Sequence, residues 1–503
     1  MTTVDSEEPT LPEPAGAVGE APAAVATAIP TTTTSARKPD GLGPLLARLH
    51  FYAGILVAPF LLVAAVTGLL YTFTPQLDSL VYGKELHVAQ SGGSTVPLSE
   101  QVAAARAEHP KGTLTAVRPG SGDDTTQVDF ALPELGEKTH TIYVDPYNGR
   151  TTGQLTTWYA ETPLTTWLDA LHRNLHLGTV GRYYSEVAAS WLWVLVLGGL
   201  VLWARRRHGK RTARRLLLPD RAAKKGVRRT RSWHAVTGLW LSVGLLGLSA
   251  TGLTWSRYAG ANFSEALDAL HAHTPSVATT LTTGTSGTSA SDGSGAAKSV
   301  DPAAIDGILK AARADGVGGP VEIALPADNA SAWTVTQTRN LWPVGRDSVA
   351  VDAGTDRVTD KVAFADWPVM AKLTRWGINA HMGTLFGLAN QILLALLASG
   401  LICVILWGYR MWWQRRPTRA DRRTALGTPP ARGAWRGLPS WTVAVGIVLV
   451  AVVGWVIPLF GIPLAVFLAL DLALGALRHR GTAVAASGRD GSAGNGSGTS
   501  SPA

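Results

Sequence analysis

The chain of 503 residues carries a net charge of +9, yet only 16% of its residues are charged. This fraction is well below the quarter that is usual for soluble domains, which argues against an ordinary soluble enzyme. The single cysteine, Cys403, excludes a disulfide framework, a CxxC redox pair, a thiolate-held iron–sulfur cluster and c-type haem attachment. Any metal in this protein must therefore be held by nitrogen or oxygen.

Low-complexity segments occur at both ends of the chain and in its second half. Residues 1–40 are rich in Ala, Pro, Thr and Glu, and they are predicted to be disordered. They also lack the basic start and early apolar core of a signal peptide. The composition of residues 276–299 predicts a flexible insertion, and that of residues 481–503 predicts a disordered Gly/Ser tail.

Long apolar runs predict a chain that crosses a membrane several times. Four of them approach the ~20 residues that span the hydrocarbon core of a bilayer: Ile55–Phe73, Val187–Trp203, Leu239–Trp255 and Ile392–Trp407. Two further runs, Val443–Ile457 and Leu464–Leu477, flank the turn-like segment 458–463. They are predicted to be two helices joined by a tight turn, and one long kinked helix is the alternative.

The placement of Lys and Arg predicts the orientation in the membrane. Basic residues crowd the short loops 205–232 and 410–439, which places both loops and the N-terminus in the cytoplasm. Segments 76–170 and 257–378 then lie outside. Because retention of these loops accounts for the basic excess, no nucleic-acid partner is expected.

Each outer segment is predicted to fold as a small α+β domain. The first is expected to contain one helix and three strands: Leu98–Glu108, then Thr113–Arg118, Thr126–Ala131 and Thr139–Val144. The second is expected to follow the same plan: Ala303–Ala314, then Val321–Ala324, Ala332–Thr338 and Ser348–Asp352.

The predicted fold is therefore a polytopic α-helical membrane protein with a four-helix core, a C-terminal helical hairpin and two small extracytoplasmic α+β domains. The expected boundaries are 1–44 for the tail; 45–75, 171–204, 233–256 and 379–409 for the core helices; 76–170 and 257–378 for the outer domains; 205–232 and 410–439 for the basic loops; 440–458 and 463–477 for the hairpin; and 478–503 for the C-terminal tail.

An internal repeat divides the core into two parallel units, a known plan of membrane proteins. Each unit opens with H-x-x-x-G, carries Thr-Gly-Leu seventeen residues after that His, and has H-x-G-T before its second helix. The matching segments are His50–Gly54 with His234–Gly238, Thr67–Leu69 with Thr251–Leu253, and His176–Thr179 with His381–Thr384.

Repeat-equivalent histidines predict two haem sites, one on each side of the membrane. His50 and His234 form the inner pair, and His176 and His381 form the outer pair. A haem iron with two imidazole ligands has both axial positions filled, which suits electron transfer. His172 lies four residues before His176, and it is expected either to replace His176 as the outer ligand or to hydrogen-bond a haem propionate. The competing interpretation is that these histidines are interfacial side chains without a ligand role.

Glycines near the inner histidines agree with a flat macrocycle. Gly54 and Gly238 follow their histidines by one helical turn, and a missing side chain there lets such a group approach the backbone. Close helix packing explains the same glycines equally well.

Recognisable nucleotide-binding chemistry is missing from the sequence. It contains no G-x-G-x-x-G, no P-loop and no H-E-x-x-H. Electrons would therefore come from a membrane quinol or from a soluble reduced flavin. Asp471 is the exceptional carboxylate within an apolar run, so a proton or ion relay has little support.

The chain resembles the PepSY-associated transmembrane helix proteins, bacterial inner-membrane proteins often found with iron uptake. The segments that carry the resemblance are Arg48–Gly54, Leu171–Gly178, Trp233–Trp240, His381–Gly387 and Trp412–Pro417, together with Tyr143–Gly149, which looks like the end of a PepSY domain.

This resemblance implies four core helices, two extracytoplasmic PepSY domains and a multi-pass protein of the bacterial inner membrane. Some members are similar to ferric-siderophore reductases that use haem b to carry electrons outward. The expected function is therefore electron transfer through one or two bis-histidine haems to an extracytoplasmic ferric chelate. The alternatives are a haem-free binding, sensory or peptidase-regulating protein and a transporter of a metal or chelate.

Overall fold

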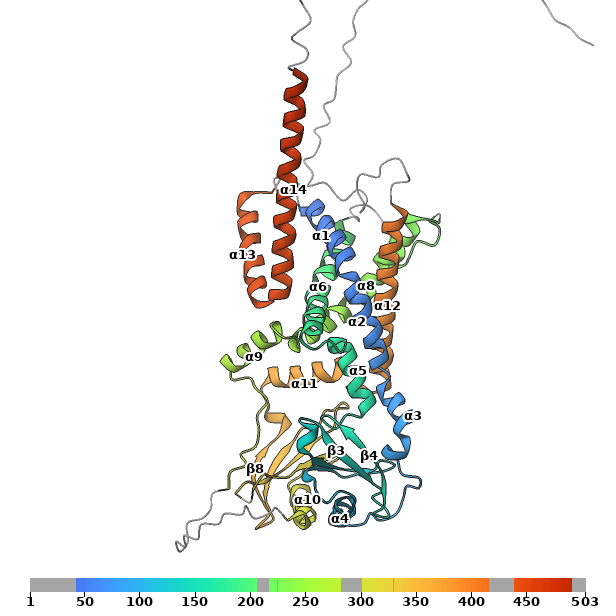
Figure 1. The fold of residues 1–503 in the computed structure, drawn as a ribbon, viewed down its shortest axis with the longest axis vertical. Helices are drawn as coiled ribbons and strands as arrows, with labels where there is room; N and C mark the ends of the chain where they lie inside the picture. The colour runs from blue at the N-terminus through green and yellow to red at the C-terminus, as the bar shows by residue number, and fades with distance from the viewer. Residues whose placement is uncertain are drawn as a thin grey trace, which may run out of the picture. The chain divides into compact units, whose positions relative to one another are not determined.

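The computed structural model describes residues 42–205, 217–223, 225–281, 301–328, 330–415 and 438–490, with side chains described up to residue 474 in the last range (Figure 1). Almost all of the predicted N-terminal tail, much of both basic loops, most of the insertion and the end of the C-terminal tail lie outside the described residues.

Among the described residues, three helices are long and apolar enough to cross a membrane: α6 (Gly178–Arg205), α8 (Val227–Thr254) and α12 (Leu388–Gln414). A fourth span results if α1 (Leu42–Leu56) and α2 (Ala58–Tyr71), which are bent by 57°, are counted together. These helices coincide with the four long apolar runs of the sequence. Within this bundle α8 packs against α6 and α12, α2 packs against α12, and α1 packs against α6.

The bend between α1 and α2 follows from Pro59. Proline has no backbone N–H, so the carbonyl of Ile55, four residues earlier, loses its helical donor. The hydroxyl of Tyr409 on α12 donates to that carbonyl at 3.0 Å. The carbonyl that loses its helical donor at the bend therefore gains a donor from the neighbouring helix α12.

The C-terminal runs form two helices, α13 (Ser440–Val456) and α14 (Pro458–Asp490), and not one long kinked helix. The chain turns at Ile457, however, and the segment 458–463, which was predicted to be the turn, forms the first part of α14 with Pro463 inside the helix. The backbones of the two helices meet closely, since a Cβ added to Gly461 would lie 2.5 Å from the Cα of Gly454. The helix α14 also packs against α6, which attaches the hairpin to the core.

Short helices connect the spans to the rest of the protein, and sequence analysis did not anticipate them: α3 (Thr74–Leu86), α5 (Pro163–Asn174), α9 (Ala259–Ala269) and α11 (Val369–His381). The start of α5 has a readable signal. The hydroxyl of Thr162 accepts the backbone N–H of Thr165 at 3.1 Å, and Pro163 occupies the first helical turn. Each of α5 and α11 carries a histidine of interest below.

The two outer segments join in one antiparallel sheet of eight strands, in the order β4-β3-β2-β1-β5-β6-β7-β8. The strands are β1 (Thr113–Arg118), β2 (Thr126–Ala131), β3 (Thr139–Val144), β4 (Thr151–Thr157), β5 (Val321–Ala324), β6 (Trp333–Gln337), β7 (Ser348–Asp352) and β8 (Arg357–Val362). The two small domains expected from sequence are thus fused at β1 and β5, where Val117 pairs with Ile323. This pairing removes an open edge from each half.

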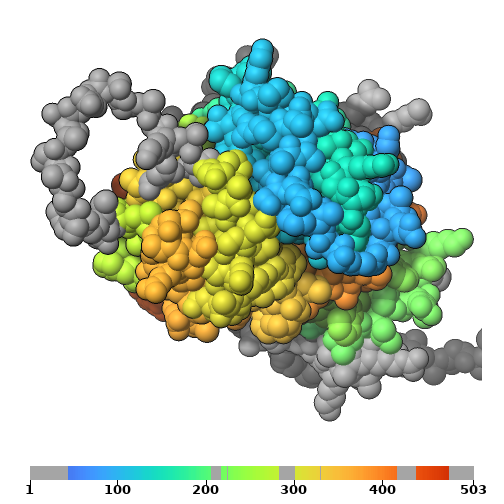
Figure 2. All heavy atoms as spheres, turned by 90° about the horizontal axis from the view of Figure 1, so that it is seen from below, coloured from blue at the N-terminus to red at the C-terminus, as the bar shows by residue number. Residues whose placement is uncertain are grey.

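One hydrophobic core serves both halves of the sheet. The helices α4 (Leu98–Glu108) and α10 (Ile305–Ala314) pack against each other, and Figure 2 shows them side by side. Val102 of α4 and Ile308 of α10 belong to the same buried cluster as the strands. The carboxylate of Asp306 accepts the backbone N–H of Leu98 at 2.8 Å, so α10 caps the start of α4.

Candidate functional site

The inner pair of histidines meets inside the helix bundle. His50 of α1 and His234 of α8 have ring centroids 6.5 Å apart, with their planes at 83°. Glycines of two other helices leave room for the rings. A Cβ on Gly199 of α6 would lie 3.3 Å from His50, and one on Gly408 of α12 would lie 3.7 Å from His234.

A backbone carbonyl fixes the tautomer of His234. Its Nδ1 lies 2.9 Å from the carbonyl oxygen of Val404, and a carbonyl only accepts, so Nδ1 carries the proton. The other nitrogen, Nε2, therefore keeps its lone pair. This is the form in which an imidazole binds a metal.

The outer pair consists of His172 of α5 and His381 at the end of α11. Their ring centroids are 6.4 Å apart, and their planes are inclined by 47°. Burial lowers the pKa of His172 to about 4, and burial together with the neighbouring His172 lowers the pKa of His381 to about 4. Both imidazoles are therefore neutral at physiological pH and suited to bind a metal.

His176, the outer ligand preferred in the sequence analysis, does not approach His381. It is exposed, follows α5 with a left-handed φ of 57°, and packs near Trp167 with ring centroids 5.0 Å apart. The geometry instead favours His172, the alternative. The reason is that H-x-G-T aligns the two repeats by sequence, whereas the helix α5 ends at Asn174 and its last full turn carries His172.

The spacing of both pairs fits a single metal ion between two rings. With metal–nitrogen bonds of about 2.0–2.1 Å, imidazoles on opposite sides of one ion hold their ring centres roughly 6.3 Å apart. Both observed separations are close to this value. In addition, a Cβ added to Gly54 or to Gly238 would meet no atom within 4 Å, so the helix surface is uncrowded one turn after each inner histidine. The residues fit haem.

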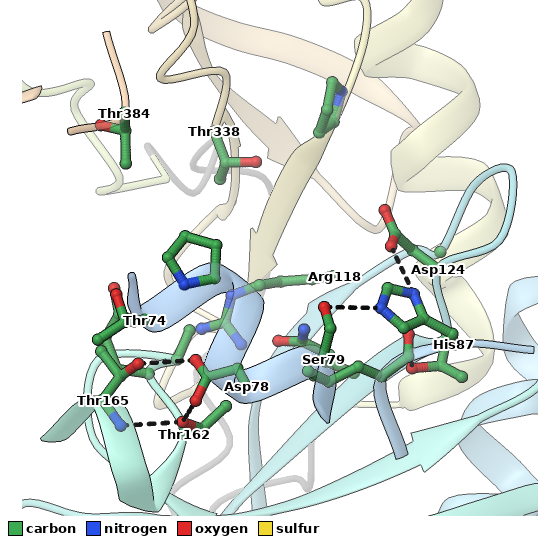
Figure 3. A pocket seen from close by; sticks show the side chains of 18 of the residues that line it. Thr74, Asp78, Ser79, His87, Arg118, Asp124, Thr162, Thr165, Thr338 and Thr384 are labelled. Carbon is green, nitrogen blue, oxygen red and sulfur yellow. Dashed lines mark hydrogen bonds and ion pairs between the residues drawn. The ribbon is translucent and has the colours of Figure 1, made fainter. Parts of the chain in front are cut away.

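A cavity of about 420 Å³ is lined mainly by polar residues, and neither His172 nor His381 is among them (Figure 3). Its walls come from α3, α5, β1, β2 and the loop after α11, and Met382, which follows His381, lines it. Asp78 is buried there and accepts hydrogen bonds from the hydroxyls of Thr162 and Thr165, both at 2.7 Å.

Acidic groups dominate the charge of this cavity. Arg118 lines it, but its guanidinium is paired with Asp129 and Glu322, both at 2.8 Å. Burial, with Asp78 and Asp169 nearby, raises the pKa of Glu161 to about 7. A ligand that carries several negative charges is disfavoured here.

A histidine and two aspartates cluster beside the cavity. His87, Asp123 and Asp124 each offer one ligand atom, and these atoms lie within 4.8 Å of one another. His87 and Asp124 line the cavity, and Ser79 lies 3.3 Å from the Nε2 of His87. No motif spacing identifies this cluster from sequence, because 35 residues separate the histidine from the aspartates.

Comparison with known proteins gives one result. The family model described as "PepSY-associated TM region" matches residues 47–415, which include all four paired histidines and the whole sheet. No curated protein matches the chain.

Proposed function

Because the chain belongs to the family of the PepSY-associated TM region and is a membrane protein of that family, we propose that it transfers electrons across the membrane through bis-histidine haem b. His50 and His234 hold the inner haem, and His172 and His381 hold the outer one. The acceptor is a ferric chelate on the extracytoplasmic side of a bacterial inner membrane.

The observation that carries this proposal is the paired spacing of 6.5 Å inside the bundle and of 6.4 Å between the connecting helices α5 and α11. His234 and Thr251, the partner of His381, are seventeen residues apart on α8, which corresponds to about 25 Å along a helix. This separation is comparable to the thickness of the hydrocarbon core. Two pairs so placed are suited to carry electrons from one face of the membrane to the other.

The chemistry that haem would supply when bound is reversible one-electron transfer. The two histidines of each pair would hold the group and provide its nitrogen ligands. The cavity whose lining includes Met382, the residue after His381, offers a place for an acceptor. A cytoplasmic reductant or membrane quinol supplies the electrons, since the sequence carries no nucleotide-binding motif.

Reduction of a ferric chelate releases iron for a simple reason. Hard oxygen donors bind Fe(III) more tightly than the softer Fe(II). The added electron converts Fe(III) to Fe(II), and the chelator leaves unchanged. The acidic walls of the cavity favour a neutral or positively charged chelate over a polyanionic one.

The test is the visible spectrum of the purified protein, oxidised and reduced, with a pyridine haemochrome assay. We expect a b-type spectrum and about two haems per chain. His234→Ala is expected to remove the inner haem, and His172→Ala the outer one. The matched control is His176→Ala, which should retain both.

Two results contradict the proposal. Full haem content in both His234→Ala and His172→Ala would exclude these ligands. A protein that stays colourless after expression with haem supplied would return the histidines to a structural role. A binding, sensory or peptidase-regulating protein, or a transporter, would then be the leading interpretation.

A further inference from the structure

The Thr-Gly dipeptide of each repeat lies against an outer histidine. Thr67 Oγ1 is 3.0 Å from the Nδ1 of His172, and Thr251 Oγ1 is 2.7 Å from the Nδ1 of His381. Both threonines lie near the end of a bundle helix, α2 or α8, and both histidines lie on the short helix that leads from the sheet back toward the bundle. The sequence repeat therefore corresponds to the same contact made twice.

The direction of both hydrogen bonds follows from the helix. A threonine hydroxyl has one proton, and in each case it is donated to the carbonyl four residues earlier: Thr67 to Val63 at 2.9 Å, and Thr251 to Gly247 at 2.8 Å. The hydroxyl oxygen is then left as an acceptor, so the histidine Nδ1 must carry a proton. Each outer imidazole consequently keeps its lone pair on Nε2.

The glycine after Thr67 makes room for the ring of His172. A Cβ on Gly68 would lie 3.0 Å from the Cε1 of His172, whereas one on Gly252 would lie 3.8 Å from the Cε1 of His381, which is an ordinary contact. Each threonine therefore fixes the tautomer of its ring, and Gly68 in addition lets the ring of His172 approach the helix.

We infer that Thr67 and Thr251 are positioning residues that set the tautomer and the basicity of the two outer ligands. The inference rests on the proposed haem function. A ligand imidazole that donates its second N–H is a more basic ligand, which stabilises the oxidised iron and lowers the reduction potential. The inner pair provides an internal reference, because His234 donates to the backbone carbonyl of Val404 and no threonine substitution removes that acceptor.

The experiment is a potentiometric titration of the purified, haem-loaded protein, followed in the visible spectrum. Thr67→Val and Thr251→Val keep the side-chain shape but remove the hydroxyl acceptor, whereas Thr67→Ser and Thr251→Ser retain it. The backbone carbonyl of Ala64 also accepts from His172, so the larger effect is expected in Thr251→Val. We expect the outer haem of each Val variant to titrate at a more positive potential, and the double variant to shift further. The Ser variants should stay near the wild type, and the inner potential should not move.

The matched control is Thr254→Val, because the Thr254 hydroxyl donates to the carbonyl of Thr251 on its own helix and, among the described residues, contacts no histidine. It should leave both potentials unchanged. Selective loss of the outer haem in the Val variants, with retention in the Ser variants, also supports the inference. Unchanged outer potentials in fully loaded Val variants overturn it, as does equal behaviour of the Ser and Val variants. A wild-type protein without haem overturns the proposed function, and this inference with it.

Discussion

Arg48 lies two residues before His50 on α1 and forms an ion pair with Asp471 of α14. Both side chains are largely buried, with 4% and 19% of their surfaces exposed. The exceptional carboxylate of the apolar runs thus has a structural partner. The pair connects the C-terminal hairpin to the helix that carries an inner histidine.

Removing one member of this pair is expected to destabilise the protein strongly. Asp471→Asn removes the carboxylate that pairs with the buried guanidinium of Arg48, and such changes typically cost about 3–5 kcal/mol. We expect a lower unfolding temperature and weaker retention of the inner haem. Replacing both residues, as Arg48→Met with Asp471→Leu, should recover most of the stability. A double variant as unstable as Asp471→Asn would show that the attraction between the charges is itself needed.

The two Thr-Gly glycines should differ in their tolerance of a methyl group. In Gly68→Ala the new carbon would lie 3.0 Å from His172, which is too close, whereas in Gly252→Ala it would lie 3.8 Å from His381, an ordinary contact. We expect Gly68→Ala to disturb the outer haem spectrum and Gly252→Ala to leave it nearly unchanged. Electron paramagnetic resonance of the oxidised protein would compare them. Equal spectra for both variants would contradict this prediction.

The pKa of Glu161 gives the stability a pH dependence. Burial, Asp78 and Asp169 raise this pKa from 4.5 to about 7, so the folded protein prefers the protonated form. The stabilisation from holding that proton is present below pH 4.5 and is lost as the pH rises through about 7. Glu161→Gln should therefore raise the unfolding temperature at pH 8 and have little effect at pH 4.5. A pH-independent difference would count against the prediction.

The capping of α4 by Asp306 of α10 should contribute measurably to the stability of the protein. The carboxylate of Asp306 accepts backbone N–H groups of Leu98 and Ser99 at 2.8 and 3.3 Å. Asp306→Ala removes this acceptor at the start of α4, and a lost cap costs about 0.5–2 kcal/mol. Asp306→Asn, which keeps an acceptor oxygen, should be affected less. Thermal unfolding of the two variants would measure the difference.

Sequence patterns located the bundle and three of its four paired histidines, because apolar length and the repeat are local signals. They preferred His176 over His172, since H-x-G-T matches by spacing while the pairing depends on where α5 ends. The hydrogen bonds that join the two repeats in the sheet, between β1 and β5, have no signal in the local sequence. The seam of β1 and β5 brings together residues about 200 positions apart in the chain, and it could not be predicted from either strand alone.

Two strands were missed for a physical reason. In β8 the side chains alternate between exposed and half-buried, so the strand has no buried apolar face for a pattern to reveal. In β4 the residues are mainly Thr, Gly and Gln, which also occur in turns. Both lie at the outer edges of the sheet, where such composition is tolerated.

The continuous sheet also relates the positions of the two outer histidines. Each half of the sheet leads, through its last strand, into the helix that presents one outer histidine: β4 into α5 with His172, and β8 into α11 with His381. The hydrogen bonds between β1 and β5 therefore help to fix the distance between α5 and α11, and with it the distance between His172 and His381. A chelate, a partner protein or a mutation that shifted this seam would change the gap between the imidazoles without touching either ring.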